Sequence, residues 1–188
     1  LMASVQAALG TGWILDIDTT IKPLYGKQAG AQVSYNPHKP GRPSHALHTY
    51  WVANLRLVLD VIVSPGKSHS AGMAQPGLTE VLDQLQPTQR PALVRGDCGF
   101  GNEPFIAQLE ERNQPYLFKL RQTAGVKKLL SRQFARDDWS TPGPTDQGWS
   151  AVEDTLKLSG WTQARRVVVL RRAVKADLVL SRKAQPSS

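Results

Sequence analysis

Residues 13–21 read Trp-Ile-Leu-Asp-Ile-Asp-Thr-Thr-Ile, and this stretch decides the fold. Apolar and polar residues alternate along it and several residues are β-branched, which predicts a strand with one buried face. Asp16 and Asp18 are two residues apart, so their side chains lie on the same face of that strand. The stretch therefore predicts a strand that carries a pair of carboxylates on its polar face.

The residues after this strand predict a sheet with helices packed on it. Residues 26–44 are rich in Gly, Pro and Asn, which predicts a loop. The other predicted elements, in chain order, are strands at about 47–53 and 55–64, a helix around 78–85, a strand at 91–96, a helix at 103–112 capped by Asn102, and a strand at 116–120. The order β-β-β-α-β-α-β indicates an α/β domain with a mixed sheet.

The last third of the chain has a different pattern. Residues 122–148 show no clear period, whereas residues 149–158 and 163–171 predict two strands joined at Ser159-Gly160. Residues 176–181 are predicted to pair with these strands. This part of the sequence is therefore expected to be β-rich.

Charge is distributed unevenly along the chain. The formal net charge is +8, yet residues 1–111 hold 8 Lys and Arg against 9 Asp and Glu, while residues 112–188 hold 15 against 6. A basic excess confined to one region favours a polyanionic partner, nucleic acid first, although a solvated basic face is the alternative. The single Cys98 excludes an internal disulfide. No apolar run is long enough to cross a bilayer and no secretory signal is present, so we expect a cytoplasmic protein without membrane contact.

Asp97 follows directly on the short apolar strand predicted at residues 91–96. Ligand sites in open α/β sheets lie at the carboxyl ends of strands, and the small residues after Asp97 permit close approach. Two carboxylates without paired His or Cys residues favour Mg²⁺ or Mn²⁺, in a two-ion site suited to phosphodiester chemistry. The alternative is that both aspartates are ordinary turn or cap residues.

Four stretches together resemble one group of proteins, the DDE transposases of bacterial insertion sequences. Residues 13–20 resemble the first catalytic strand of that group, and Val94-Arg-Gly-Asp-Cys-Gly-Phe100 is similar to its second aspartate motif. Tyr35-Asn-Pro-His-Lys-Pro-Gly-Arg-Pro-Ser-His45 resembles the loop after the first strand in one branch, and residues 65–70 occupy the place of its glycine-containing turn. The resemblance covers roughly residues 13–172.

The resemblance implies a ribonuclease-H-like fold and a division of the chain. Residues 13–122 would form an incomplete catalytic core and residues 123–181 part of a β-rich insertion, with tails at 1–12 and 182–188. The implied function is DNA transposition, through metal-dependent phosphodiester cleavage and strand transfer at the ends of the element. Mg²⁺ or Mn²⁺ is the implied cofactor.

The resemblance also assigns roles to single residues. Asp18, before Thr19-Thr20, would be the first metal-binding catalytic acid, with Asp16 as the alternative, and Asp97 would be the second. The third, a glutamate on a helix after the insertion, is not found, so we expect a truncated copy. A catalytically inactive DNA-binding remnant and another ribonuclease-H-like nuclease are the alternatives.

Basic residues in both parts of the chain are the candidates for contacting DNA. The expected partner is double-stranded DNA, both element ends and target, with a homodimer as the candidate assembly. His45 and His48 are expected to be surface or DNA-facing residues. The predicted nucleic-acid contacts are Lys39, Arg42, Arg95, Lys119, Arg121, Arg165 and Arg166.

Overall fold

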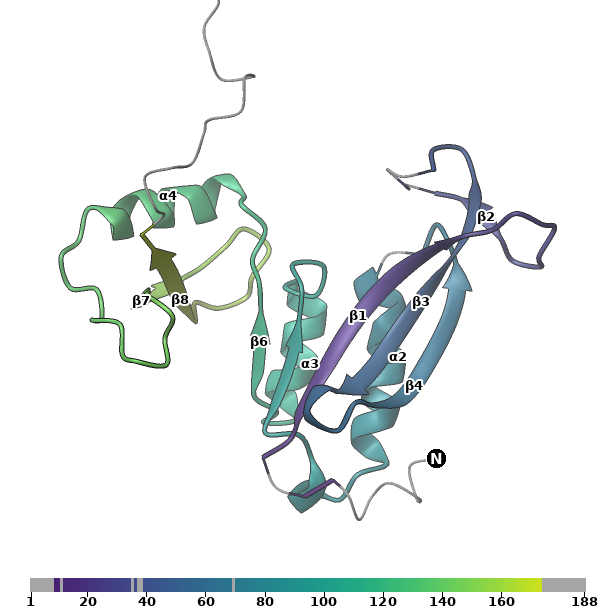
Figure 1. Cartoon of the computed structure of the whole chain (residues 1–188), viewed down its shortest axis with the longest axis horizontal. Coiled ribbons are helices and arrows are strands. Elements are labelled where there is room, and N and C mark those ends of the chain that lie inside the picture. The colour runs from purple at the N-terminus through teal and green to yellow at the C-terminus, as the bar shows by residue number, and fades with distance from the viewer. Residues whose placement is uncertain (1–8, 11, 35, 37–38, 69, 174–188) are drawn as a thin grey trace, which may run out of the picture. The chain divides into compact units, whose positions relative to one another are not determined.

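The computed structural model describes residues 9–10, 12–34, 36, 39–68 and 70–173. The chain divides into two compact units, unit 1 at residues 1–121 and unit 2 at residues 122–188 (Figure 1). The strand predicted at 176–181, the predicted tail at 182–188 and most of the predicted tail at 1–12 lie outside the described residues.

Unit 1 is an α/β domain built on one mixed sheet. β1 pairs antiparallel with β3 and parallel with β5, β5 pairs parallel with β6, and β2 and β4 both pair antiparallel with β3. Apart from the two-residue β2, the order β-β-β-α-β-α-β is confirmed. The strands are β1 (Ile14–Pro23), β2 (Gln32–Val33), β3 (Pro43–Val52), β4 (Leu57–Pro65), β5 (Leu93–Gly96) and β6 (Tyr116–Phe118).

The two helices described in unit 1 cover the same face of its sheet. α2 (Ser70–Asp83) and α3 (Glu103–Glu111) lie behind the strands in the view of Figure 1, with short 3-10 turns at Ala53–Leu55 and Pro87–Gln89. As predicted, Asn102 caps α3, its side chain accepting a hydrogen bond from the Phe105 amide. Apolar side chains are buried between the helices and the sheet. Burying one large apolar side chain stabilises the folded state by roughly 1.5–3 kcal/mol, so this apolar core is the main source of stability in the unit. Its buried members include Leu15, Ile17, Tyr50, Leu78, Leu82, Val94, Phe100, Phe105 and Leu109.

α2 begins at Ser70, whereas the sequence predicts a helix around residues 78–85. The sequence pattern misses the earlier part because it contains residues that usually end helices. Gly72, Pro76 and Gly77 lie inside the helix. Gly77 is required by packing, since a Cβ there would overlap the Tyr50 ring and the Ile62 side chain. The Tyr50 hydroxyl donates to the backbone oxygen of Ala74 in the same helix. Close contact between α2 and the sheet thus explains why Gly77, a residue that weakens the helical pattern, lies inside the helix.

The prediction of a loop at residues 26–44 is wrong near the end of this range. β2 lies inside this range, and β3 already begins at Pro43 rather than near residue 47. Along β3, the even-numbered side chains from Ser44 to Val52 are buried. The strand therefore has an alternating pattern that starts in a segment whose Gly and Pro content indicates a loop.

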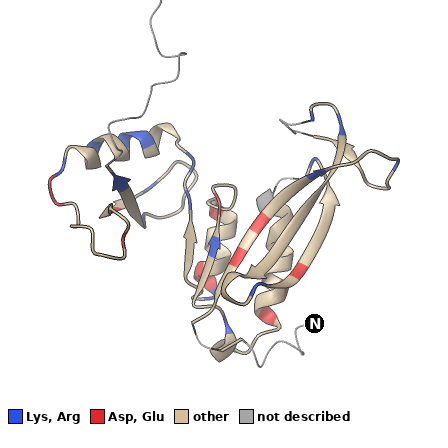
Figure 2. Ribbon diagram, in the orientation of Figure 1, with Lys and Arg blue, Asp and Glu red and all other residues tan. Residues whose placement is uncertain are grey.

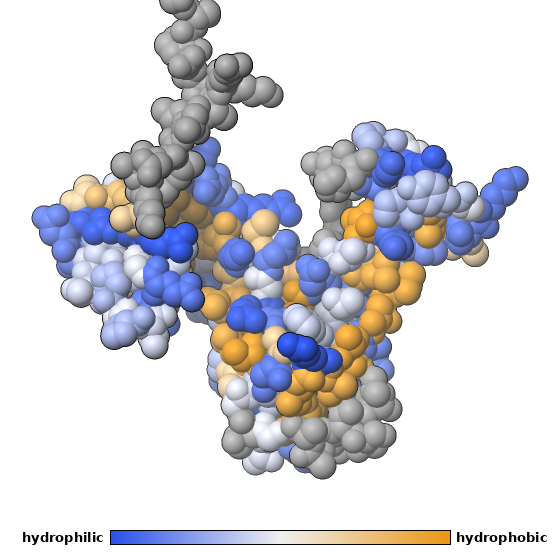
Figure 3. Space-filling view, in the orientation of Figure 1, coloured by the Kyte–Doolittle hydropathy of each residue, from blue (hydrophilic) through white to orange (hydrophobic). Residues whose placement is uncertain are grey.

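The other face of the unit 1 sheet carries apolar side chains beside the acids of β1. The exposed apolar residues on it include Trp51, Val58, Val61, Val63 and Leu117. In Figure 3, hydrophobic residues gather on this face over β3 and β4. These positions are on the opposite side of the strands from the buried core, as the register of β3 with β4 requires.

The described part of unit 2, residues 122–173, is a two-stranded antiparallel hairpin with one helix packed on it. β7 (Trp149–Leu156) pairs with β8 (Arg165–Arg172), which confirms the predicted hairpin. Its small core contains Leu129, Trp139, Val152 and Val169. The helix, α4 (Ala124–Phe134), lies in the stretch for which the sequence shows no clear period. Unit 2 is therefore less purely β-rich than predicted.

No helix among the residues that the structure describes is long and apolar enough to cross a membrane.

Candidate metal site

The register of two parallel strands brings Asp18 and Asp97 next to each other. Ile17 of β1 pairs with Gly96 of β5, and the two aspartates are the residues that follow. Parallel neighbours are about 4.8 Å apart. Ile17 points into the core, so Asp18 points to the other face, and both aspartates are exposed. The predicted pair is thus at one place on the face of the sheet that carries no helix of unit 1.

Threonine hydroxyl groups contact Asp18 on both sides. Thr20 Oγ1 donates to Asp18 Oδ2 at 3.4 Å, and Thr49 Oγ1 of β3 donates to the backbone oxygen of Asp18 at 3.5 Å. Thr49 is also the residue opposite Asp18 in the antiparallel register. Among the residues that the structure describes, Asp18 Oδ1 has no such contact, so one oxygen of this carboxylate is open to a ligand.

Asp97 is held by the turn that follows β5. Its Oδ1 accepts a hydrogen bond from the Gly99 amide at 2.8 Å, which is the local side-chain turn typical of aspartate. Phe100 anchors this turn in the core, where its ring contacts Phe105 and Phe118. Gly96 allows β5 to lie close to its neighbours, because a Cβ there would crowd Phe100 and Ile17. Packing beneath the turn therefore fixes the direction of the Asp97 carboxylate.

Asp16 lies on the same face as Asp18 but both of its oxygens are engaged. Arg95, its partner in the register of β1 with β5, donates from Nε to Oδ1 at 2.6 Å and from Nη2 to Oδ2 at 2.9 Å. The hydrogen bond from Arg95 to Asp16 raises the arginine's pKa. Asp16 is thus neutralised by an arginine, whereas the Asp18 carboxylate accepts a hydrogen bond from the Thr20 hydroxyl and forms no ion pair among the described residues. Figure 2 shows acidic residues in red along β1.

The other predicted cations of unit 1 lie in different parts of it. Lys119 follows β6, and its amide donates to the Gly96 oxygen at 3.4 Å. Because Gly96 pairs with Phe118, Lys119 lies next to Asp97 at the carboxyl ends of β5 and β6. Lys39 is exposed in the turn before β3, and the Arg42 guanidinium lies 4.5 Å from the Tyr25 ring centre. Arg121 is exposed at the end of the unit. Only Arg95 and Lys119 are in the immediate surroundings of the two aspartates by register.

The two arginines predicted in unit 2 differ in their surroundings. Arg165 is only 7% exposed and lies over the Trp161 ring, at 5.0 Å from its centre. Arg166 is exposed and forms a bidentate ion pair with Glu153 across the hairpin. Both side chains therefore make contacts within unit 2.

His48 is a buried residue that the sequence interpretation placed at the surface, and that prediction is wrong. It is completely buried opposite Thr19, whose Oγ1 lies 2.9 Å from His48 Nδ1. Burial lowers the pKa of His48, so the ring is neutral at pH 7. The signal that could have found it is the alternation of Ala46, His48 and Tyr50 along β3.

The donor groups fit a hard divalent cation in part. Two carboxylates on adjacent strands offer the oxygen ligands that Mg²⁺ and Mn²⁺ prefer. Within the described part of the chain, no group of three or more His, Cys, Asp or Glu residues is arranged to hold a metal. Asp18 and Asp97 are thus the candidate protein ligands on this face.

Comparisons with known proteins agree with the sequence resemblance. Two solved structures are similar to parts of the chain: a simian T-cell lymphotropic virus intasome in complex with PP2A regulatory subunit B56 gamma (14% identity, TM-score 0.41, 67% of this chain and 38% of that chain), and a piggyBac transposase synaptic complex with hairpin DNA (15%, 0.45, 92% and 35%). The chain thus spans less than two fifths of either. No curated protein matches it. The family described as transposase DDE domain group 1 matches residues 6–181, and the chain belongs to this family.

Proposed function

We propose that this chain forms the metal-binding part of a DNA transposase, which cleaves phosphodiester bonds at element ends and transfers the strands. Membership of the DDE transposase family supports the general reaction. The observation that carries the proposal is the register of β1 with β5, which makes Asp18 and Asp97 neighbours on an exposed face. Residues 13–122 would be the catalytic core and 123–181 part of an insertion.

The two aspartates would hold Mg²⁺ or Mn²⁺, which when bound stabilises charge at the phosphate and activates a water or a 3′-hydroxyl group. Asp18 offers Oδ1, while Thr20 holds Oδ2, and Asp97 is aimed by the Gly99 amide. Arg95 keeps Asp16 neutralised, which lowers the repulsion that a third nearby carboxylate would add. Lys119 would offset phosphate charge beside Asp97. A third carboxylate ligand is not assigned to any residue of this chain.

The test is Mn²⁺ binding and Mn²⁺-dependent nicking of supercoiled plasmid by the whole chain. Asp18→Asn and Asp97→Asn keep the shape of the side chain and remove its charge. We expect each variant to bind Mn²⁺ at least tenfold more weakly, which corresponds to about 1.4 kcal/mol. Electron paramagnetic resonance measures this affinity. We also expect each variant to lose nicking activity. Glu111→Gln, at the end of α3, is the control with the same charge change.

The two readouts separate the candidate functions. Loss of metal binding and nicking in both aspartate variants, with the control unchanged, supports the proposal. Metal and DNA binding without nicking by the wild-type chain would support the inactive DNA-binding remnant. Nicking without strand transfer would support a nuclease. Mn²⁺ affinity unchanged in Asp97→Asn would refute the assigned site.

A further inference from the structure

The six arginines of the described part of unit 2 all contact a carboxylate or an aromatic ring of the same unit. Arg132 pairs with Asp154, Arg136 with Asp138 and Arg166 with Glu153. The remaining three lie over tryptophan rings: Arg165 over Trp161, Arg171 over Trp139 and Arg172 over Trp149. Arginine suits such planar contacts because its guanidinium group stacks and binds carboxylates through two nitrogens.

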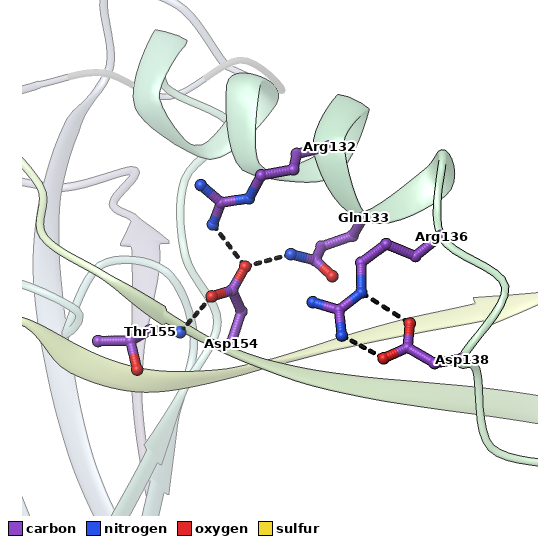
Figure 4. A network of polar contacts seen from close by, with 6 residues as sticks. All are labelled: Arg132, Gln133, Arg136, Asp138, Asp154 and Thr155. Atoms are coloured by element: carbon purple, nitrogen blue, oxygen red, sulfur yellow. Dashed lines mark hydrogen bonds and ion pairs between the residues drawn. The ribbon is translucent and has the colours of Figure 1, made fainter.

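The arginine contacts hold the elements of unit 2 together. Asp154 of β7 accepts hydrogen bonds from Arg132 at 2.5 Å and from Gln133, both on α4, and from the Thr155 amide (Figure 4). Gln133 is completely buried. Figure 4 shows Arg132 and Gln133 reaching from the helix to the strand, beside the pair of Arg136 with Asp138. These cations are therefore part of the packing of the unit.

The lysines of the same unit behave differently. Lys127 and Lys128 are exposed on α4, and Lys157 is exposed at the end of β7. In the described part of the chain, no side-chain hydrogen bond or ion pair is recorded for these three lysines. Their ammonium groups are available to a partner, whereas the guanidinium groups are engaged.

The positions of Lys127 and Lys128 do not increase the stability of α4. The inner face of α4 is formed by Val126, Leu129 and Gln133, so Lys127 and Lys128 project from the other side. The helix has three basic residues and no acidic one. Figure 2 shows α4 in blue and tan without red. Lys128 and Arg132 are four residues apart, where like charges repel, and cations near a helix N-terminus oppose its dipole. A polyanion bound to this face would relieve both effects.

We propose that the outer face of α4, through Lys127 and Lys128, contacts the phosphate backbone of double-stranded DNA, while the arginines of unit 2 maintain its fold. This inference rests on the proposed function, because that function makes DNA the partner. It assigns the phosphate contacts of unit 2 to a helix, in place of the β8 residues Arg165 and Arg166 that the sequence suggested.

The test is the salt dependence of binding to a fluorescent DNA duplex, measured by anisotropy on the whole chain. Each phosphate contact contributes about 0.9 to the slope of log Kobs against log salt concentration. We expect Lys127→Gln with Lys128→Gln to lower the slope by about 1.8 and Lys127→Arg with Lys128→Arg to retain it. Glutamine is a good helix former, so α4 should stay folded.

The control removes two charges from unit 1. Arg56 follows the turn after β3, and Arg112 is the C-cap of α3; both lie at the edge of the sheet where β1 and β5 begin, away from Asp97. Arg56→Gln with Arg112→Gln should leave the slope unchanged. Equal losses in both double variants would show a general charge effect and overturn the proposal.

The experiment also separates this inference from the proposed function. If the lysine double variant bound and nicked DNA with a wild-type salt slope, the role of α4 would be refuted and the proposed function would stand. Absence of DNA binding by the wild-type chain would refute the proposed function as well. A reduced slope with unchanged Mn²⁺ affinity supports the inference, because the lysines then act on DNA and not on the metal site.

Discussion

At the scale of single residues, the structure distinguishes three aspartates that the sequence presents as similar. Asp16 and Asp18 are on one face of β1, but a bidentate arginine contact engages Asp16 and leaves Asp18 open. Asp97 joins Asp18 through the strand register. The Arg95–Asp16 contact spans 79 positions of the sequence, so only the folded chain reveals it. The preference for Asp18 over Asp16 thus has a physical basis in charge pairing.

Thr20 should tune the proposed metal site through its hydroxyl group. Thr20→Val keeps the branched shape but removes the hydrogen bond to Asp18 Oδ2. A hydrogen bond of this kind is worth about 0.5–1.5 kcal/mol, and this one is long and exposed. We expect Mn²⁺ affinity, measured by electron paramagnetic resonance, to fall about twofold to fivefold. Thr20→Ser retains the donor and should bind Mn²⁺ like the wild type. An unchanged affinity in Thr20→Val would show that the hydroxyl does not orient Asp18.

At the scale of elements, sequence patterns predicted those parts whose contacts are local. β1, β5, β6 and the capped α3 follow from alternation, strand-end residues and the Asn102 cap. α4 was missed because its third buried position is Gln133, a polar residue whose side chain donates a hydrogen bond to Asp154 on β7. The part of α2 before residue 78 was missed because it contains Gly77, which has a low helix propensity. Contact with the Tyr50 ring, and not helix propensity, requires glycine at this position. In both cases a partner distant in sequence determines the element.

Gly77 and Gly72 offer a matched pair of substitutions within α2. Gly77→Ala would press a methyl group against the buried Tyr50 ring, and overpacking costs about 1–3 kcal/mol. Alanine gains about 1 kcal/mol in helix propensity, so we expect a net loss of up to about 2 kcal/mol in the free energy of unfolding. Gly72→Ala meets no atom within 4 Å and should be neutral or stabilising. Urea unfolding of both variants measures the difference, and equal effects would contradict the packing explanation.

At the scale of the whole molecule, the two units are stabilised by different means. Unit 1 has a large apolar core between its sheet and two helices. Unit 2 has a core of few residues, and ion pairs join α4 to β7 and β7 to β8 in it. Small cores contribute little stability, so charge pairing has a larger share in unit 2. Its stability should therefore depend more strongly on pH.

Acid should destabilise unit 2 through three carboxyl groups. Hydrogen bonds from Arg132, Arg136 and Arg166 lower the pKa values of Asp154, Asp138 and Glu153 below the ordinary 3.8 for Asp and 4.5 for Glu. A lowered folded-state pKa stabilises the fold above the ordinary pKa, and this contribution is lost as the pH falls through the folded-state value. We expect the free energy of unfolding of unit 2 to be constant from pH 7 to about 5 and to decline below about 4.

The residue that should dominate this decline is Asp154, because it joins α4 to β7 and receives three hydrogen bonds. Urea unfolding at pH 3 to 7, followed by the NMR amide signals of β7 and β8, reports on unit 2 separately from unit 1. Asp154→Asn should lower stability at pH 7 and flatten the dependence on pH. Asp137→Asn removes a charge that forms no ion pair among the described residues and should keep the wild-type profile. If Asp154→Asn retained the wild-type dependence of stability on pH, the ion pairs would be surface contacts that do not stabilise unit 2. The arginines of unit 2 would then be candidates for contacting DNA again.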